Sequence, residues 1–81
     1  MDKSYFVSYV GWSTLEIGVI EFDCPLCAQE QVELFEVSGY EATLREYEAG
    51  SPLAAELRKD RGYKDRRGDR ASAEYLAIVK P

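Results

Sequence analysis

Two runs of alternating side chains in residues 4–23 restrict the fold of this chain more than any other feature. Residues 4–12 and 14–23 each place apolar side chains at every second position, which is the period of a β-strand. The faces of the first run are Tyr5, Val7 and Tyr9 against Phe6, Ser8 and Val10. A short link containing Gly11 joins the two runs. The pattern therefore predicts an antiparallel hairpin.

The segment after the hairpin is compatible with two structures. Pro25 ends the second strand because proline cannot donate to a strand ladder. As a helix, residues 28–37 place Ala28, Val32 and Phe35 on one face. As a strand, the same residues divide their apolar side chains between both faces. We favour the helix and keep the strand as the alternative.

Two further helices are predicted between residues 38 and 62. Ser38 precedes Glu41 by three residues, which is the spacing of a capping box. Tyr40, Leu44 and Tyr47 then recur at helical spacing, so we expect a helix that ends near Gly50. Ser51 followed by Pro52 predicts the N-terminus of another short helix. Gly62 would end it.

The C-terminal part of the chain is expected to contain a loop and a strand. Residues 62–71 are mostly charged or glycine, which predicts a mobile surface loop. Residues 73–79 alternate with apolar side chains on both faces, as expected of a strand in the same sheet. The fold class is therefore α+β in one compact domain over residues 1–81: an N-terminal antiparallel hairpin, two or three short helices and a C-terminal strand. A chain this short buries little surface, so a homodimer or a docked partner would stabilise it.

The charge is divided unevenly along the chain. Residues 1–57 contain eleven acidic side chains against two basic ones, a net charge of −9, whereas residues 58–70 have a net charge of +4. The acidic part is too negative to bind a nucleic-acid backbone, but it can attract a basic protein surface. The alternative interpretation is that these carboxylates only keep the protein soluble.

Several function classes are excluded or disfavoured. The chain has no histidine, so Ser–His triads and His-ligated metals are excluded. No apolar stretch is long enough for a transmembrane helix, and the first twenty residues lack the pattern of a secretory signal. We therefore expect a cytoplasmic protein. Glu16, Glu21 and Asp23 are rigidly placed carboxylates, but no nucleophile, base and oxyanion set accompanies them. We expect no enzyme activity and no cofactor.

The pair Cys24 and Cys27 is the most distinctive local motif. A Cys-x-x-Cys at a strand end that leads into a helix is typical of redox-active thiols. The sequence Cys-Pro-Leu-Cys resembles the Cys-Pro-x-Cys site of glutaredoxins, although the rest of the chain does not follow that family. The pair supplies two of the four ligands of a structural zinc site, so zinc would require a second chain. Free cysteines without activity are the third interpretation.

The basic segment offers a weaker signal for phosphate binding. Arg66, Arg67 and Arg70 could contact phosphate groups, but three aspartates lie among them and Tyr63 is the one aromatic side chain available for stacking on bases. We therefore expect weak nucleic-acid binding at most.

Four segments carry a resemblance to a known class of proteins. They are Lys3 to Tyr9, Ile17 to Asp23 followed by Pro25, Gln29 to Glu36, and Tyr75 to Val79. This layout resembles small phage-encoded α+β proteins, among them inhibitors of the anti-CRISPR type. The resemblance implies a protein made in the host cytoplasm that blocks a nucleic-acid-binding host protein such as a CRISPR effector.

These observations favour a non-catalytic, acidic interaction module that binds a basic protein surface. Tyrosines are common anchors in such interfaces, and glutamates would supply the charge. The candidate contact residues are Glu30, Glu33, Glu36, Tyr40, Glu41, Glu46, Tyr47 and Glu48. The alternative is a small thiol redox or zinc-binding protein that uses Cys24 and Cys27.

Overall fold

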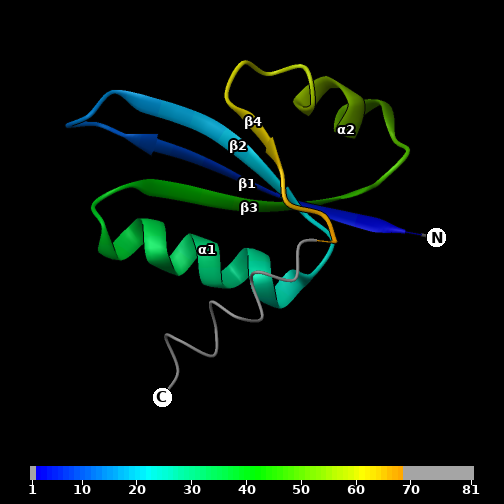
Figure 1. The fold of residues 1–81 in the computed structure, drawn as a ribbon, viewed down its shortest axis with the longest axis horizontal. Helices are drawn as coiled ribbons and strands as arrows, with labels where there is room; N and C mark the ends of the chain where they lie inside the picture. The colour runs from blue at the N-terminus through cyan, green and yellow to red at the C-terminus, as the bar shows by residue number, and fades with distance from the viewer. Residues whose placement is uncertain (1, 69–81) are drawn as a thin grey trace.

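The computed structural model describes residues 2–68, which form a four-stranded mixed sheet with one helix on each face (Figure 1). The elements in chain order are β1 (Lys3–Gly11), β2 (Glu16–Phe22), α1 (Pro25–Val37), β3 (Glu41–Glu48), α2 (Pro52–Leu57) and β4 (Tyr63–Asp65). The α+β class and the N-terminal hairpin are confirmed. Neither helix is long and apolar enough to cross a membrane, within the part of the chain described.

The strands lie in the order β3-β1-β2-β4. The hairpin pairs β1 with β2 from Tyr5 opposite Phe22 to Gly11 opposite Glu16. β3 pairs with the other side of β1 and is also antiparallel, whereas the short β4 runs parallel to β2. β3 and β4 are therefore the two edges of the described sheet. The side chains of each strand alternate between the two faces, so each face needs its own cover.

Helix α1 covers one face, which confirms the helix favoured for residues 28–37. Ala28 and Val32 are buried against the hairpin, and Phe35 is stacked on Tyr9 with ring centroids 4.3 Å apart. The buried strand residues of this cluster are Val7, Tyr9, Ile20 and Phe22. The chain leaves the helix through Gly39, whose φ of 87° favours glycine.

Helix α2 covers the opposite face and is much shorter. It begins after Ser51, whose hydroxyl accepts a hydrogen bond from Ala54 N at 3.2 Å, as predicted from the Ser-Pro pair. Ala54 is fully buried against Phe6 and Val19. The small side chain of Ala54 lets the helix lie close to the sheet.

The helix expected between Ser38 and Gly50 is wrong, because residues 41–48 form β3. The apolar side chains of this segment fit both the 3.6-residue period of a helix and the two-residue period of a strand. Leu44 packs toward α1 and Tyr47 packs on Phe6 on the other face, which is the alternation of a strand. Pairing with β1 along the whole strand outweighs the helix propensity of its Glu, Ala and Leu residues.

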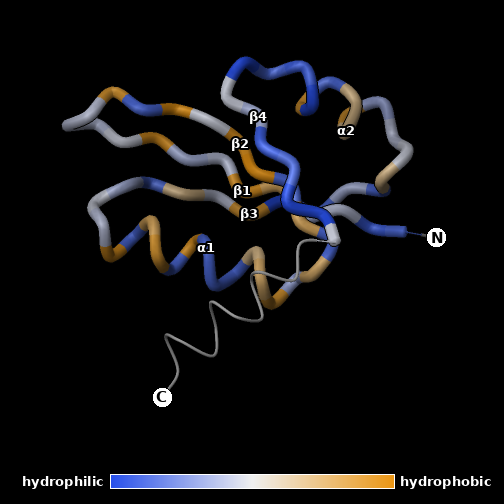
Figure 2. The backbone as a smooth tube through the Cα atoms, viewed as in Figure 1, coloured by the Kyte–Doolittle hydropathy of each residue, from blue (hydrophilic) through white to orange (hydrophobic). Residues whose placement is uncertain are grey.

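The loop expected over residues 62–71 is wrong at Tyr63–Asp65, which form β4. Val19 N donates to Gly62 O at 3.3 Å, and Arg66 N donates to Glu21 O at 2.8 Å, so β4 continues the ladder of β2. Figure 2 shows that this segment is strongly hydrophilic, which is why its composition suggested a loop. The strand expected over 73–79 lies outside the described residues.

Candidate functional site

The outward side of α1 carries a line of four side chains. Leu26, Glu30, Glu33 and Val37 follow one another at spacings of four, three and four residues, which aligns them along one side of a helix. Leu26 is 74% exposed and Val37 is 82% exposed, while Glu33 between them is also exposed. The line spans about 16 Å at the rise of an α-helix. It presents carboxylates between two apolar ends.

The neighbouring edge strand adds more carboxylates to this part of the molecule. Glu41, Glu46 and Glu48 are exposed on β3; Glu46 and Glu48 lie on the α1 face of the strand with Leu44, and Glu41 lies on the other face of the same edge. Glu46 forms an ion pair with Lys3 at 3.4 Å, in which both side chains are about half exposed. Arg45 is the single cation in residues 25–48. We call the glutamates of α1 and β3 the acidic surface: Glu30, Glu33, Glu36, Glu41, Glu46 and Glu48.

The two tyrosines expected as exposed anchors are half-buried. Tyr40 packs on Phe35 and Tyr9, and its hydroxyl donates to Glu16 Oε1 at 2.5 Å. Tyr47 packs on Phe6 with ring centroids 5.9 Å apart. Both rings therefore extend the core, and the exposed apolar contacts beside the acidic surface are Leu26 and Val37 instead.

A buried carboxylate lies on the other side of the sheet. Glu21 of β2 is completely buried, and Arg58 holds it with two hydrogen bonds, Nε to Oε1 at 2.8 Å and Nη2 to Oε2 at 2.7 Å. The hydroxyl of Ser4 donates to Oε2 at 2.5 Å, and the hydroxyl of Tyr63 donates to Oε1 at 2.6 Å. This network ties α2 and β4 to the hairpin.

The network keeps Glu21 ionised. Burial by itself would raise the pKa of Glu21, but the hydrogen bonds from Arg58, Ser4 and Tyr63 and the charge of Arg67 outweigh it and lower the pKa from 4.5 to about 2. The same contact and burial raise the pKa of Tyr63 to about 12. A carboxylate with its oxygens occupied in this way is a poor general base, so the network has a structural role.

Much of the basic segment is already engaged within the protein. Arg58 is held by Glu21, and Arg67 forms two hydrogen bonds of 3.0 Å with Asp65 while its Nε lies 3.4 Å from Glu21 Oε2. Of the three arginines predicted to contact phosphate, Arg66 is exposed and Arg70 lies outside the described residues. Arg67 would have to leave its acidic partners to bind a phosphate group.

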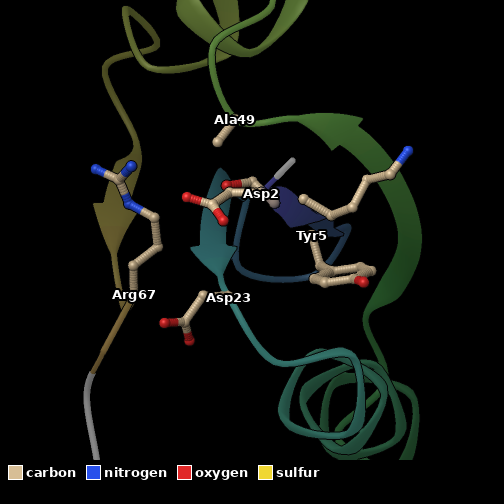
Figure 3. A pocket seen from close by; sticks show the side chains of 7 residues that line it. Asp2, Tyr5, Asp23, Ala49 and Arg67 are labelled. Carbon is tan, nitrogen blue, oxygen red and sulfur yellow. The ribbon is translucent and has the colours of Figure 1, made fainter.

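An open pocket of about 530 Å³ lies beside the start of β1, the residues that follow β2 and β3, and Arg67 after β4 (Figure 3). Its lining residues are Asp2, Lys3, Ser4, Tyr5, Asp23, Ala49 and Arg67. Lys3 and Arg67 are paired with carboxylates, and Asp23 accepts a hydrogen bond from Gly68 N at 3.0 Å. The mixed charges of this pocket favour neither an anion nor a cation.

The two cysteines lie in the first turn of α1. Cys24 is the N-cap residue, and its Sγ accepts a hydrogen bond from Cys27 N at 3.4 Å. Both cysteines are half-buried and neither is in a disulfide, and Cys27 contacts the cluster beneath α1. No group of three or more metal-binding side chains was found within residues 2–68, so zinc would still require ligands from elsewhere.

Two features of these sites were not anticipated from the sequence. Glu21 was noted as a rigid carboxylate, but its partner Arg58 is 37 residues away and was considered as part of the basic segment. A charge flanked by Ile20 and Phe22 was the available signal, because a buried acid needs a partner. The line from Leu26 to Val37 follows from helical spacing once α1 is known to be a helix.

No protein-family model matches the chain, and no curated protein or solved structure is significantly similar to it.

Proposed function

We propose that the protein is a non-catalytic interaction module whose acidic surface binds a partner that presents clustered Lys and Arg side chains. The observation that carries this proposal is the line Leu26, Glu30, Glu33 and Val37 on α1. A basic patch with apolar side chains around it would complement this line. The apolar ends would contribute contact area, and the carboxylates would orient the partner.

The positions of the acids on α1 support a role other than helix stability. The helix dipole favours acidic side chains in the first turn and basic ones in the last. α1 has no acid in its first turn and no base in its last, while Glu36 is its penultimate residue. Glu36 therefore costs the helix a few tenths of a kcal/mol up to about 1 kcal/mol. A carboxylate retained there is consistent with an external partner.

The separation of charge across the sheet also supports the proposal. β3 and the acidic surface lie at one edge, and β4 with the cations that follow α2 lies at the other. The described cations of that edge are Arg58, Lys59, Arg61, Lys64, Arg66 and Arg67. A partner that approaches the α1–β3 side meets a negative field with little opposing charge, which favours fast and oriented association.

The partner class that fits best is a nucleic-acid-binding protein, because such proteins carry clusters of Lys and Arg. The resemblance to phage-encoded inhibitors makes a CRISPR effector of the host a specific candidate. In that case the acidic surface would occupy the positive surface that otherwise holds nucleic acid. Binding would then be mutually exclusive with an oligonucleotide.

Charge reversal at Glu36, with a matched reversal on the other helix, tests the proposal. Glu56 is the penultimate residue of α2, as Glu36 is of α1, and both are exposed. Glu36→Lys and Glu56→Lys therefore make the same charge change at equivalent helix positions. We expect Glu36→Lys to leave stability unchanged or raise it, and to reduce capture of basic proteins from a host lysate. Glu56→Lys should capture the same proteins as the wild type.

Surface plasmon resonance with a purified CRISPR effector as the probe adds the kinetics. The proposal predicts that Glu36→Lys associates with the effector more slowly than the wild type does. The association rate should also fall as the salt concentration rises, and an oligonucleotide should compete for the effector. Equal capture and equal kinetics for wild type, Glu36→Lys and Glu56→Lys would refute the acidic surface as the binding site. If the CRISPR effector does not bind but the wild type still captures other basic proteins selectively, only that candidate partner is refuted.

A further inference from the structure

We propose that Cys24 and Cys27 form a thiol–disulfide exchange site in which Cys24 is the attacking thiol. The substrate class is a small or protein disulfide that can reach the exposed start of α1. This site is independent of the acidic surface, and its test does not depend on the proposed function.

The geometry of the first turn of α1 places the two sulfur atoms together. Cys24 is the N-cap residue, and Cys27 follows one turn later, so both side chains lie on the same side of the helix. Cys27 N donates to Cys24 Sγ at 3.4 Å, which brings the backbone of Cys27 to the sulfur of Cys24. Pro25 at the first helical position fixes the backbone between them. A disulfide can therefore close across this turn without moving α1 off the sheet.

The surroundings of the two thiols differ, and the difference assigns their roles. The backbone hydrogen bond from Cys27 is the largest contribution that lowers the pKa of the Cys24 thiol, and it outweighs the opposing effects of burial and of the Asp23 carboxylate. The start of a 13-residue helix also favours a negative sulfur at the N-cap. Cys27 packs toward the cluster under α1. Cys24 is thus the thiol prepared to attack, and Cys27 the one that resolves.

The exchange is balanced with an external disulfide as the oxidant. The Cys24 thiolate attacks one sulfur of glutathione disulfide, a mixed disulfide forms, and one glutathione thiolate leaves. Cys27 then loses its proton and attacks Cys24 Sγ, which expels the second glutathione. Two protein thiols are oxidised to one disulfide, and one glutathione disulfide is reduced to two glutathione molecules. The reverse sequence reduces a disulfide substrate.

Trapping of the mixed disulfide identifies the attacking thiol. Cys27→Ser cannot resolve the intermediate, so treatment with glutathione disulfide should leave one glutathione on Cys24, as detected by mass spectrometry. Cys24→Ser should gain glutathione more slowly, because its remaining thiol, Cys27, packs toward the cluster under α1 and does not have the N-cap position. The wild type should instead form the internal Cys24–Cys27 disulfide.

The Asp23 carboxylate provides a second, independent test. It raises the pKa of the Cys24 thiol, so Asp23→Asn should lower that pKa. A lower pKa raises the thiolate fraction at pH 7, and the accompanying loss of nucleophilicity offsets this only in part, so alkylation of Cys24 should be faster in Asp23→Asn than in the wild type. Glu56→Gln, on α2 at the opposite face of the sheet, removes the same charge and should leave the rate unchanged.

Three results would overturn the proposal. Equal glutathione attachment to both single variants would show that Cys24 has no special reactivity. Oxidation that yields only intermolecular disulfides would show that the two sulfurs cannot close the turn. Stoichiometric zinc bound through Cys24 and Cys27 in the purified protein would assign the pair to a metal site instead.

Discussion

At the residue scale, the charge of Glu21 holds together four side chains: Ser4, Arg58, Tyr63 and Arg67. Its folded pKa of about 2 lies below the ordinary 4.5, so the network contributes fully above pH 4.5 and its contribution is lost as the pH falls toward 2. The difference corresponds to about 3 kcal/mol, of which about 2 kcal/mol is lost by pH 3.

Glu21→Gln tests this dependence. The substitution removes the charge and leaves Arg58 with a neutral partner, so we expect a loss of about 3 kcal/mol at pH 7. The stability difference between wild type and variant should shrink by about 2 kcal/mol at pH 3, where Glu21 is mostly protonated in the unfolded chain but still mostly ionised in the folded protein. Urea denaturation of both proteins at the two pH values measures it. An equal difference at both would mean that Glu21 is not the titrating group.

The sulfur of Cys24 caps α1, and serine can perform the same function. Serine is among the best N-cap residues, so Cys24→Ser should change the free energy of unfolding by less than about 0.5 kcal/mol, whereas Cys24→Ala should cost about 1 kcal/mol. Thermal unfolding under reducing conditions compares the two variants. A large loss in Cys24→Ser would point to a structural role of the sulfur that capping does not explain.

At the element scale, the contact between β2 and β4 depends on two glycines that meet backbone to backbone. A Cβ at Gly62 would lie 2.7 Å from Ile17 O and 2.8 Å from Gly18 Cα, and backbone atoms cannot move aside. Gly62→Ala should therefore destabilise the protein by about 1–3 kcal/mol. Gly50→Ala is the control, because its Cβ would meet open space.

Hydrogen exchange locates the effect of that substitution. Gly62→Ala should increase exchange at Arg66 N, which bonds to Glu21 O across the β2–β4 ladder, and leave the β1–β3 pairing protected. If hydrogen exchange became equally faster over the whole sheet, the idea that β4 can separate from β2 without unfolding the other strands would be contradicted.

The elements differ in how far the sequence predicts them, and the reason is the range of the interactions that form them. The hairpin and the start of α2 depend on neighbouring residues: alternation, Gly11, and the Ser51–Pro52 pair. β3 depends on pairing with β1, about forty residues earlier, and the spacing of Tyr40, Leu44 and Tyr47 in and before it also fits a helix. β4 has three residues, and its parallel pairing with β2 leaves no local pattern.

The candidate sites also divide into one formed by neighbouring residues and others formed by residues far apart in the sequence. The proximity of Cys24 and Cys27 could be expected from their spacing before a helix, because an N-cap and the residue three positions later are local neighbours, but the spacing left redox, zinc-binding and inactive thiols as alternatives. The network around Glu21 joins Ser4, Arg58 and Tyr63 from three other elements, which no local pattern reveals. Glu41, Glu46 and Glu48 were expected on a helix and lie on the edge strand β3, where charge also discourages pairing between sheets.

At the scale of the whole molecule, the charges of the described residues are divided between the α1–β3 side and the β4 side. The acidic side repels polyanions over roughly a Debye length, about 8 Å at physiological salt. On the basic side, Arg58 and Arg67 are held by Glu21 and Asp65, which reduces the charge free to bind phosphate. The opposing sides also make the direction of approach important for any charged partner.

The last prediction is that the protein binds nucleic acid weakly at most, because within residues 2–68 Arg58, Lys59 and Arg67 are paired with carboxylates and the net charge of −5 is unfavourable. In a fluorescence titration with a labelled single-stranded oligonucleotide at about 0.15 M salt, we expect no binding in the micromolar range. Substituting Arg66 with Ala should have no measurable effect, and Glu36→Lys should strengthen any residual binding by removing repulsion. Micromolar affinity that disappears in Arg66→Ala would instead make the basic edge the functional surface. The acidic surface would then be the side that keeps nucleic acid in one orientation.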